Sequence, residues 1–295
     1  MVSEVESRTV RTPDGRDLCV EIAGPGARWP VLVHHGTPSS RHSYVRWIED
    51  AAARDIKLIG YDRPGYGGSS PQPGRSVADC AGDVQAIADA LGIERLAVWG
   101  LSGGGPHALA CAALLPELVV ASGLVASVAP WQAPGLDYFD GMGEENVEEL
   151  QLYFSDREES RRKSKQLRDE LVQVTADQLA STMETLLSPA DAAVLNDDFA
   201  EWMAEGSREG LAPGEQGWWD DGVAHMSPWG FDFDSINVPV KVWQGRHDRF
   251  VPFQHGQWLA EHVPHAEAAL SDTDGHLTLL VDKVGEVHEW LLAHF

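Results

Sequence analysis

The chain has 295 residues, 43% of them hydrophobic and 23% charged, enough for one large α/β domain or for a core domain that carries an insertion. Its 46 acidic residues against 22 basic ones give a net charge of −24, which excludes nucleic acid and anionic membranes as partners. The three cysteines, Cys19, Cys80 and Cys111, have no C-x-x-C spacing, and we expect buried free thiols in a reducing compartment. Since we find neither a signal peptide nor a membrane-spanning apolar window, we expect a cytoplasmic protein.

Apolar runs that alternate with amphipathic segments predict strands that alternate with helices. In chain order we expect a hairpin over 8–23, strand 30–34, helix 43–54, strand 55–61, helix 77–91, strand 94–100, helix 103–114 and strand 118–128. After a long interruption we expect strand 239–244, helix 254–262, strand 266–270 and one last helix with Leu280, Val284, Val287 and Leu291 on one face. Such alternation predicts an α/β fold with a mainly parallel sheet that is covered on both faces.

The interruption begins at Pro130 and lasts to about Ser235. This stretch is helical in pattern, charged and rich in tryptophan, and it contains no convincing buried strand. We therefore expect an α/β core formed by 1–129 and 236–295, with a helical cap inserted over 130–235.

One short stretch carries the strongest chemical signal. Gly100, Ser102 and Gly104 fit G-x-S-x-G, a strand–turn–helix elbow that holds a serine on a strained turn. The glycines leave no β-carbon in the crowded turn, and the following helix directs unpaired N–H groups at the same place. A phosphate-binding loop would need G-x-x-x-x-G-K-[ST] or G-x-G-x-x-G, and neither pattern is present.

A serine nucleophile needs a base that a third group orients, and the chain order Ser, Asp, His is one known arrangement. Asp248 follows the predicted strand 239–244, and His276 lies in a later polar loop between a strand and a helix. A carboxylate just past the end of a parallel strand lies at the edge where ligands bind. We therefore predict Ser102 as nucleophile, His276 as base and Asp248 as the orienting acid.

Rival residues lie beside both partners of the serine. His247 adjoins Asp248, and a neighbour in sequence cannot easily receive the hydrogen bond that the base needs. Asp272 and Asp274 lie in the loop of His276 itself, which makes either one a less favourable orienting acid than Asp248.

The mechanism also needs an oxyanion hole. We predict one donor at the N–H of Gly103, directly after the nucleophile, and the other at the N–H of Thr37, in the loop after strand 30–34. A metal site at His34–His35 is disfavoured, because adjacent histidines do not readily face one ion and no further ligand set accompanies them. We expect neither a metal nor an organic cofactor.

Five motifs, Gly100–Gly104, His35–Pro38, Asp62–Ser69, Gly245–Asp248 and Gly275–His276, together resemble the α/β-hydrolase fold superfamily. The resemblance implies an eight-stranded sheet, a Ser-His-Asp triad and a cap over the site. It is closest to the group of capped esterases, proline iminopeptidases and cofactor-free haloperoxidases. A serine stands where related haloalkane dehalogenases and epoxide hydrolases have an aspartate, and the oxyanion loop lacks the Gly-Gly-Pro-Gly of proline iminopeptidases.

The cap gives softer signals. Its tryptophans either line an apolar substrate pocket or attach the cap to the core, and the sequence leaves both open; the candidates are Trp131, Trp218, Trp219 and Trp229. The sequence thus predicts a serine hydrolase that cleaves a small, apolar carboxylic ester and acts as a monomer or homodimer. The alternatives are an aminopeptidase similar to proline iminopeptidase and a ligand-binding member of the fold without catalysis.

Overall fold

The structure is a computed structural model that describes residues 4–295. Eight strands form one sheet in the order β1-β2-β4-β3-β5-β6-β7-β8, which confirms the predicted strand number. Antiparallel pairing joins β1 to β2 and β2 to β4, and all other neighbours are parallel. The strands are β1 (Val5–Arg11), β2 (Asp17–Ala23), β3 (Trp29–His34), β4 (Ile56–Tyr61), β5 (Leu96–Leu101), β6 (Val119–Val125), β7 (Val240–Gly245) and β8 (Glu267–Ser271).

Burial along each strand follows its place in the sheet. Every residue of β5 and β6 is buried, as expected of central parallel strands with helices on both faces. The two edge strands, β1 and β8, are largely exposed.

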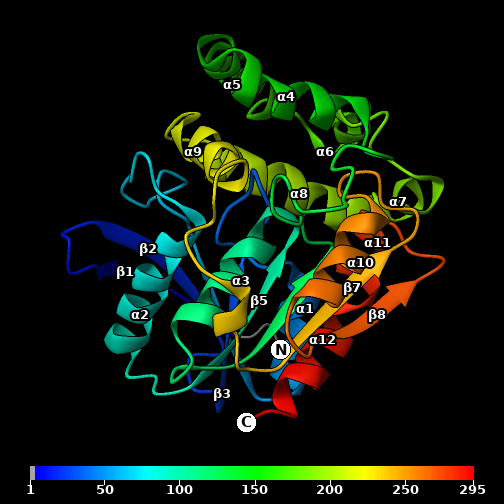
Figure 1. Cartoon of the computed structure of the whole chain (residues 1–295). Helices are drawn as coiled ribbons and strands as arrows, with labels where there is room; N and C mark the ends of the chain where they lie inside the picture. Colours follow the sequence, from blue (N-terminus) through cyan, green and yellow to red (C-terminus); the bar gives the residue numbers. More distant parts are fainter. Residues whose placement is uncertain (1–3) are drawn as a thin grey trace.

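Helices cover both faces of the sheet (Figure 1). One apolar layer packs the sheet against α2 (Cys80–Leu91), α3 (Gly105–Leu114) and α10 (Phe253–His262). The opposite layer packs it against α1 (Val45–Ala53), α11 (His276–Asp282) and α12 (Val284–Leu292). The short 3-10 turns η1 (Val77–Asp79) and η2 (Ser102–Gly104) precede α2 and α3. Gly92 ends α2 in the left-handed conformation, with φ 66°, where a glycine carries no steric cost.

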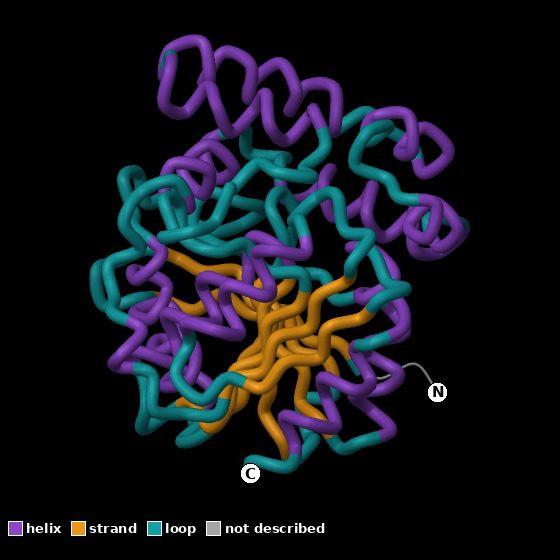
Figure 2. Tube along the Cα trace, turned by 45° about the vertical axis from the view of Figure 1, so that its right-hand side comes forward, coloured by secondary structure: helices purple, strands orange, loops and turns teal. Residues whose placement is uncertain are grey.

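Residues 130–235, which we call the insertion, lie between β6 and β7 and contain only helices and loops. Figures 1 and 2 show the α-helices of the insertion gathered beyond the carboxyl ends of the parallel strands. They are α4 (Glu144–Ser155), α5 (Arg157–Leu171), α6 (Ala176–Leu179), α7 (Pro189–Val194), α8 (Asp197–Gly210) and α9 (Gln216–His225), with the 3-10 turns η3 (Ala180–Thr182) and η4 (Phe233–Ser235).

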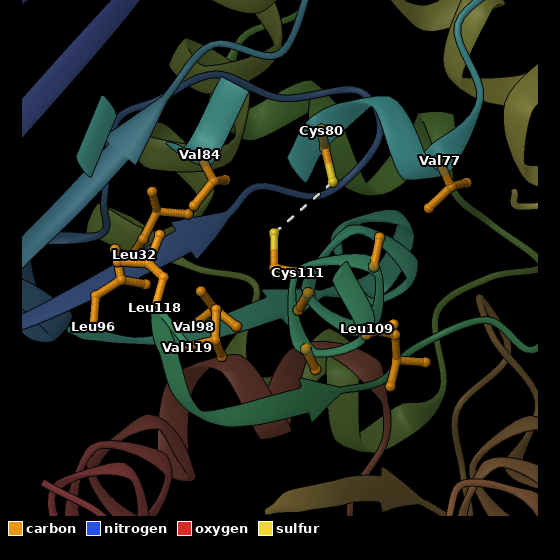
Figure 3. Packing of buried hydrophobic residues seen from close by; sticks show 14 of the residues in the cluster. Leu32, Val77, Cys80, Val84, Leu96, Val98, Leu109, Cys111, Leu118 and Val119 are labelled. Atoms are coloured by element: carbon orange, nitrogen blue, oxygen red, sulfur yellow. Dashed lines mark hydrogen bonds between the residues drawn. The ribbon is translucent and has the colours of Figure 1, made fainter. Parts of the chain in front are cut away.

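Two details differ from the sequence prediction. The expected last helix is two helices, α11 and α12, which part at Lys283 because α11 packs on α7 and β7 whereas α12 packs on α1, β5 and β6. Cys19 is only half-buried, although all three cysteines are free thiols. Cys80 and Cys111 are buried between α2 and α3 with their Sγ atoms 3.9 Å apart (Figure 3). Within residues 4–295, no helix has both the length and the apolar character needed to cross a bilayer.

Candidate active site

Ser102 occupies a strained turn directly after β5. Its φ is +52°, in the left-handed region that few residues other than glycine adopt. The turn is too tight for side chains on either side: a β-carbon at Gly100 would collide with the main chain of Gly104, and one at Gly104 with the carbonyl of His34. The glycines of G-x-S-x-G are thus required sterically, and Ser102 is the residue that the turn presents.

Asp248 and His276 meet from separate loops. Asp248 follows β7, His276 opens α11 after β8, and the His276 Nδ1–Asp248 Oδ2 distance is 2.8 Å. The other carboxylate oxygen of Asp248 accepts hydrogen bonds from the main-chain N–H groups of Phe250 and Val251, at 2.9 and 2.8 Å. With Nδ1–H donating to Asp248, the imidazole keeps Nε2 free for a proton, which is the tautomer a base needs.

The surroundings favour a charged imidazolium. Burial alone would lower the pKa of His276, but the charge of Asp248, its hydrogen bond and the charge of Asp191 outweigh burial and raise that pKa above its ordinary value. The ring of Phe250 stacks on the imidazole, with centroids 4.6 Å apart, and covers one of its faces.

The rival residues lie elsewhere. His247 is exposed, and the exposed carboxylate of Asp272 pairs with Arg246 at 2.6 Å. Asp274 contributes its main-chain carbonyl, which accepts the N–H of His247. The carboxylate on the imidazole of His276 is therefore that of Asp248.

The two predicted oxyanion residues are neighbours in space. A β-carbon built on Gly103 would lie 2.9 Å from Cβ of Thr37. One built on Gly36 would lie 3.8 Å from Cβ of Ser102, so the loop after β3 runs beside the serine. The structure brings Thr37, Gly103 and Ser102 together.

A buried arginine, which sequence reasoning missed, organises this loop. Arg63 is fully buried and donates to the carbonyls of His35 and Gly36 and, at 2.8 Å, to Oγ1 of Thr37. Its countercharge is Asp221 of α9, at 2.6 Å, which also accepts from Oγ1 of Thr37 at 3.1 Å. The motif Asp62–Ser69 contains Arg63, but nothing in the sequence of the insertion singled out Asp221.

Charge and burial oppose each other in this cluster. Burial would raise the pKa of Asp221, but the charges of Arg63 and Arg75 outweigh it and hold that pKa well below its ordinary range.

Two histidines contact the main chain of Gly103: His225 Nε2 and His107 Nδ1 lie 2.9 and 3.1 Å from its carbonyl oxygen. Both face this oxygen as N–H donors, which ties Gly103 to α9 and α3.

The four tryptophans are divided among three apolar clusters. Trp131 and Trp219 both pack against the cluster of Tyr138, Tyr153 and Met226, and the guanidinium of Arg161 lies over the ring of Trp219. The other two, Trp218 and Trp229, are buried in separate apolar clusters that join the insertion to core residues. Their predicted role in binding substrate stays a prediction.

An open groove of about 820 Å³ lies on the outer side of the insertion, between α5 and the segment formed by α6 and η3. Most of the residues that line it are polar, among them Arg162, Lys165 and Gln178. None of the predicted site residues lines this groove. We therefore do not assign the groove to the chemistry at Ser102.

The parallel sheet, the glycine-flanked serine turn and the Asp248–His276 pair define the class of α/β hydrolases. The chain matches the family model described as alpha/beta hydrolase fold over residues 30–283, and it belongs to that family.

Relatives within the family include hydrolases with different named substrates. The chain is 26% identical over 249 residues to a bifunctional esterase/perhydrolase of Acinetobacter calcoaceticus, covering 83% of each chain. It is also 26% identical over 290 residues to a 2-hydroxy-6-oxononadienedioate/2-hydroxy-6-oxononatrienedioate hydrolase of Cupriavidus pinatubonensis, covering 92% of this chain and 89% of the relative. Among solved structures, a thermophilic esterase of Thermogutta terrifontis has the same fold, with TM-score 0.71, 19% identity, and coverage of 98% of this chain and 100% of the esterase.

Proposed function

We propose that this hydrolase is a serine esterase that cleaves a small, apolar carboxylic ester through an acyl-enzyme. Ser102 attacks the acyl carbon, and Nε2 of His276 takes the hydroxyl proton. Asp248 holds the imidazole and stabilises the imidazolium, while the N–H groups of Thr37 and Gly103 bind the oxyanion. The ester C–O bond then breaks, and the imidazolium of His276 gives its proton to the departing alcohol, which leaves the acyl group on Ser102 and the imidazole neutral. Water next attacks the acyl carbon while His276 takes a proton from it, and the carboxylic acid leaves as that proton returns to the oxygen of Ser102.

One observation carries the proposal: the serine held at φ +52° after β5 together with the 2.8 Å contact between His276 and Asp248. A serine hydroxyl is a weak nucleophile without such a base, and an oriented His–Asp pair is what activates it. Neither the strained serine nor the buried ion pair has an evident purpose in a protein that only binds ligands.

The insertion does not favour an aminopeptidase. Such an enzyme must bind the ammonium group of its substrate, and several carboxylates of the insertion already have partners. Glu209 pairs with Arg41, Glu148 pairs with Lys163, and Glu145 accepts from Thr185.

A dianionic substrate, like those named for the Cupriavidus relative, calls for a free cation near the serine. Arg63, which contacts Thr37, is instead neutralised by Asp221, and Arg75, which shares Asp221 with it, also pairs with Asp220. This pairing favours an uncharged ester.

Covalent labelling tests the mechanism. A fluorescent alkyl phosphonate should label the wild type at Ser102 and leave Ser102→Ala unlabelled, while Ser181→Ala, which changes an exposed serine of η3, should be labelled normally. Undiminished labelling of Ser102→Ala would place the nucleophile elsewhere.

A substrate panel tests the specificity. Activated esters of graded acyl length should be hydrolysed, whereas a prolyl amide and a 2-hydroxy-6-oxo-dienedioate should show little turnover. Faster turnover of the prolyl amide than of every ester would favour the aminopeptidase alternative. A wild type inert toward the whole panel and toward the phosphonate would favour the non-catalytic one.

The pH dependence of kcat/KM tests the base. Since the imidazole must be neutral to accept a proton, kcat/KM should fall on acidification, with its midpoint above the ordinary histidine value of about 6.5 because the pKa of His276 is raised. A flat profile from pH 5 to 8 would mean that another group or step governs the rate.

A further inference from the structure

Asp191 of α7 is a buried carboxylate that lies against the main chain of the proposed base. It is 0% exposed, and it belongs to the insertion, 85 residues before His276. Its Oδ2 accepts the N–H of His276 at 3.1 Å, and its Oδ1 accepts those of Leu277 and Thr278 at 2.7 and 3.2 Å. One side chain therefore fixes three consecutive residues, the first of which is the base.

The place is built to hold this carboxylate. Oγ of Ser188 donates to Oδ2 of Asp191 at 2.8 Å, and a β-carbon at Gly275 would collide with the same oxygen. The partners of the carboxylate are thus one hydroxyl and three main-chain amides, none of them charged. A negative charge suits the first turn of a helix, where main-chain N–H groups lack partners within the helix.

Two carboxylates act on His276 from different elements. Asp248, in the loop after β7, contacts the imidazole directly, and Asp191 reaches it from α7 on the insertion side. Phe250, from the loop after β7, covers one ring face with an uncharged side chain. Asp274, from the loop between β8 and α11, is one of the charges that raise the pKa of Lys283 at the end of α11. The charges around the base therefore come from both the core and the insertion.

We propose that Asp191 is a positioning residue for His276: it holds the main chain of the base in place, and its negative charge, added to that of Asp248, stabilises the imidazolium. This inference rests on the proposed role of His276 as the base. It makes the insertion a working part of the catalytic apparatus, since the residue that holds the base is not in the α/β core.

The test uses Asp191→Asn, which keeps the size of the side chain and removes its charge. We expect kcat on an activated ester to fall by about tenfold to a hundredfold, the effect of a small misplacement of a catalytic group. We also expect the acid limb of kcat/KM to move to lower pH, because a charge that favours the imidazolium is gone. A merely structural role would lower activity without moving the limb.

A matched control is Asp156→Asn. Asp156 is also an aspartate of the insertion that accepts two N–H groups at the start of a helix, α5, but it is exposed and that helix carries no proposed catalytic residue. This variant should keep the wild-type kcat and the wild-type acid limb.

Since Asp191→Asn removes a buried charge, its fold is checked by circular dichroism, and Ser188→Ala provides a milder route. Without its hydroxyl partner the carboxylate is held less firmly, so this variant should show a smaller fall in kcat and a smaller shift in the same direction. If a folded Asp191→Asn, or Ser188→Ala where Asp191→Asn does not fold, keeps the wild-type kcat and limb, the inference is wrong. Phosphonate labelling separates the two proposals: labelling at Ser102 that depends on His276 upholds the mechanism even when the role of Asp191 fails.

Discussion

The α/β core and the insertion differ in how they are held together. In the core, every residue of β5 and β6 is buried. In the insertion, α5 has 15 residues and buries only Ser160 and Ser164, yet α7 and α9 bring the buried carboxylates of Asp191 and Asp221 to the loops of the proposed site. Apolar packing thus builds the core, while buried polar bonds of α7 and α9 link the insertion to the loops that carry His276 and Thr37.

The largest effect that separates the two regions is expected from acid. Burial lowers the pKa of five histidines, four of them in the core: to about 3 for His34, to about 4 for His225 and His255, and well below the ordinary value for His35 and His107. In the unfolded chain these histidines bind protons at about pH 6.5, whereas in the folded chain they do so only at lower pH. Their contribution to the free energy of unfolding is therefore fully present above pH 6.5 and is lost as the pH falls toward the pKa of each folded histidine. Each histidine removes about 1 kcal/mol per pH unit.

Over the roughly 1.5 pH units from 6.5 to 5, the five histidines together remove on the order of 7 kcal/mol, which is comparable to a typical stability of about 5–15 kcal/mol. Urea unfolding followed by tryptophan fluorescence from pH 8 to 5 measures this loss. His225→Gln should reduce the slope by about a fifth, and His247→Gln, at an exposed position, should leave it unchanged. A free energy of unfolding that is constant between pH 7 and 5 would contradict the prediction.

Next in size is the loss of the charge that joins the insertion to the oxyanion loop. Asp221→Asn leaves the buried guanidinium groups of Arg63 and Arg75 without their shared partner, and we expect a cost of about 3–5 kcal/mol in urea unfolding. The control is Glu209→Gln, which breaks more exposed ion pairs with Arg41 and His42 and should cost less than about 1 kcal/mol. Equal losses in the free energy of unfolding would mean that the buried ion pairs of Asp221 stabilise the protein no more than the exposed ones of Glu209.

A smaller effect is expected where α4 meets α9. A β-carbon at Gly222 would collide with the ring of Tyr153, so Gly222→Ala should cost about 1–3 kcal/mol through overpacking. Tyr153→Leu makes room, and the double variant should therefore be more stable than the sum of the two single changes predicts. Strict additivity in thermal or urea unfolding would show that this contact does not attach α4.

The smallest effect is expected on α5. Glu159 pairs with Arg162 one turn away, and both side chains are exposed. Glu159→Gln should change the free energy of unfolding by less than about 0.5 kcal/mol, because exposed pairs gain little and salt screens them. A cost above 1 kcal/mol would show that α5 depends on its charges.

The sequence predicted the strands and helices that follow from a periodic apolar pattern, and it predicted the serine turn, whose geometry depends on a few neighbouring residues. The apolar run through Val98 and Trp99 could only be a buried strand, and Gly100 and Gly104 are required by the turn at Ser102. The order of the predicted strands also brought Asp248 near His276, because the carboxyl ends of parallel strands meet at one edge.

The sequence could not predict contacts that depend on how the insertion docks. Asp191 and Asp221 are two of 46 acidic residues, and neither stands at a spacing that sets it apart. The break at Lys283 was missed for a related reason: the apolar period continues through Val284, and only the different packing partners of α11 and α12 separate them. Burial of a single polar residue follows from tertiary packing, which no local pattern encodes.

The main chain of Gly65, in the core, packs directly against that of Gly217, in α9 of the insertion: a β-carbon on Gly65 would lie 2.8 Å from Cα of Gly217. With no side chains between them, α9 cannot slide without opening a gap beside the Asp221 ion pairs. Its amide hydrogens should therefore exchange with solvent as slowly as those of the core, while those of α5 exchange sooner. We therefore expect the insertion to open first at α5, the helix that buries least, before α9 separates from the core.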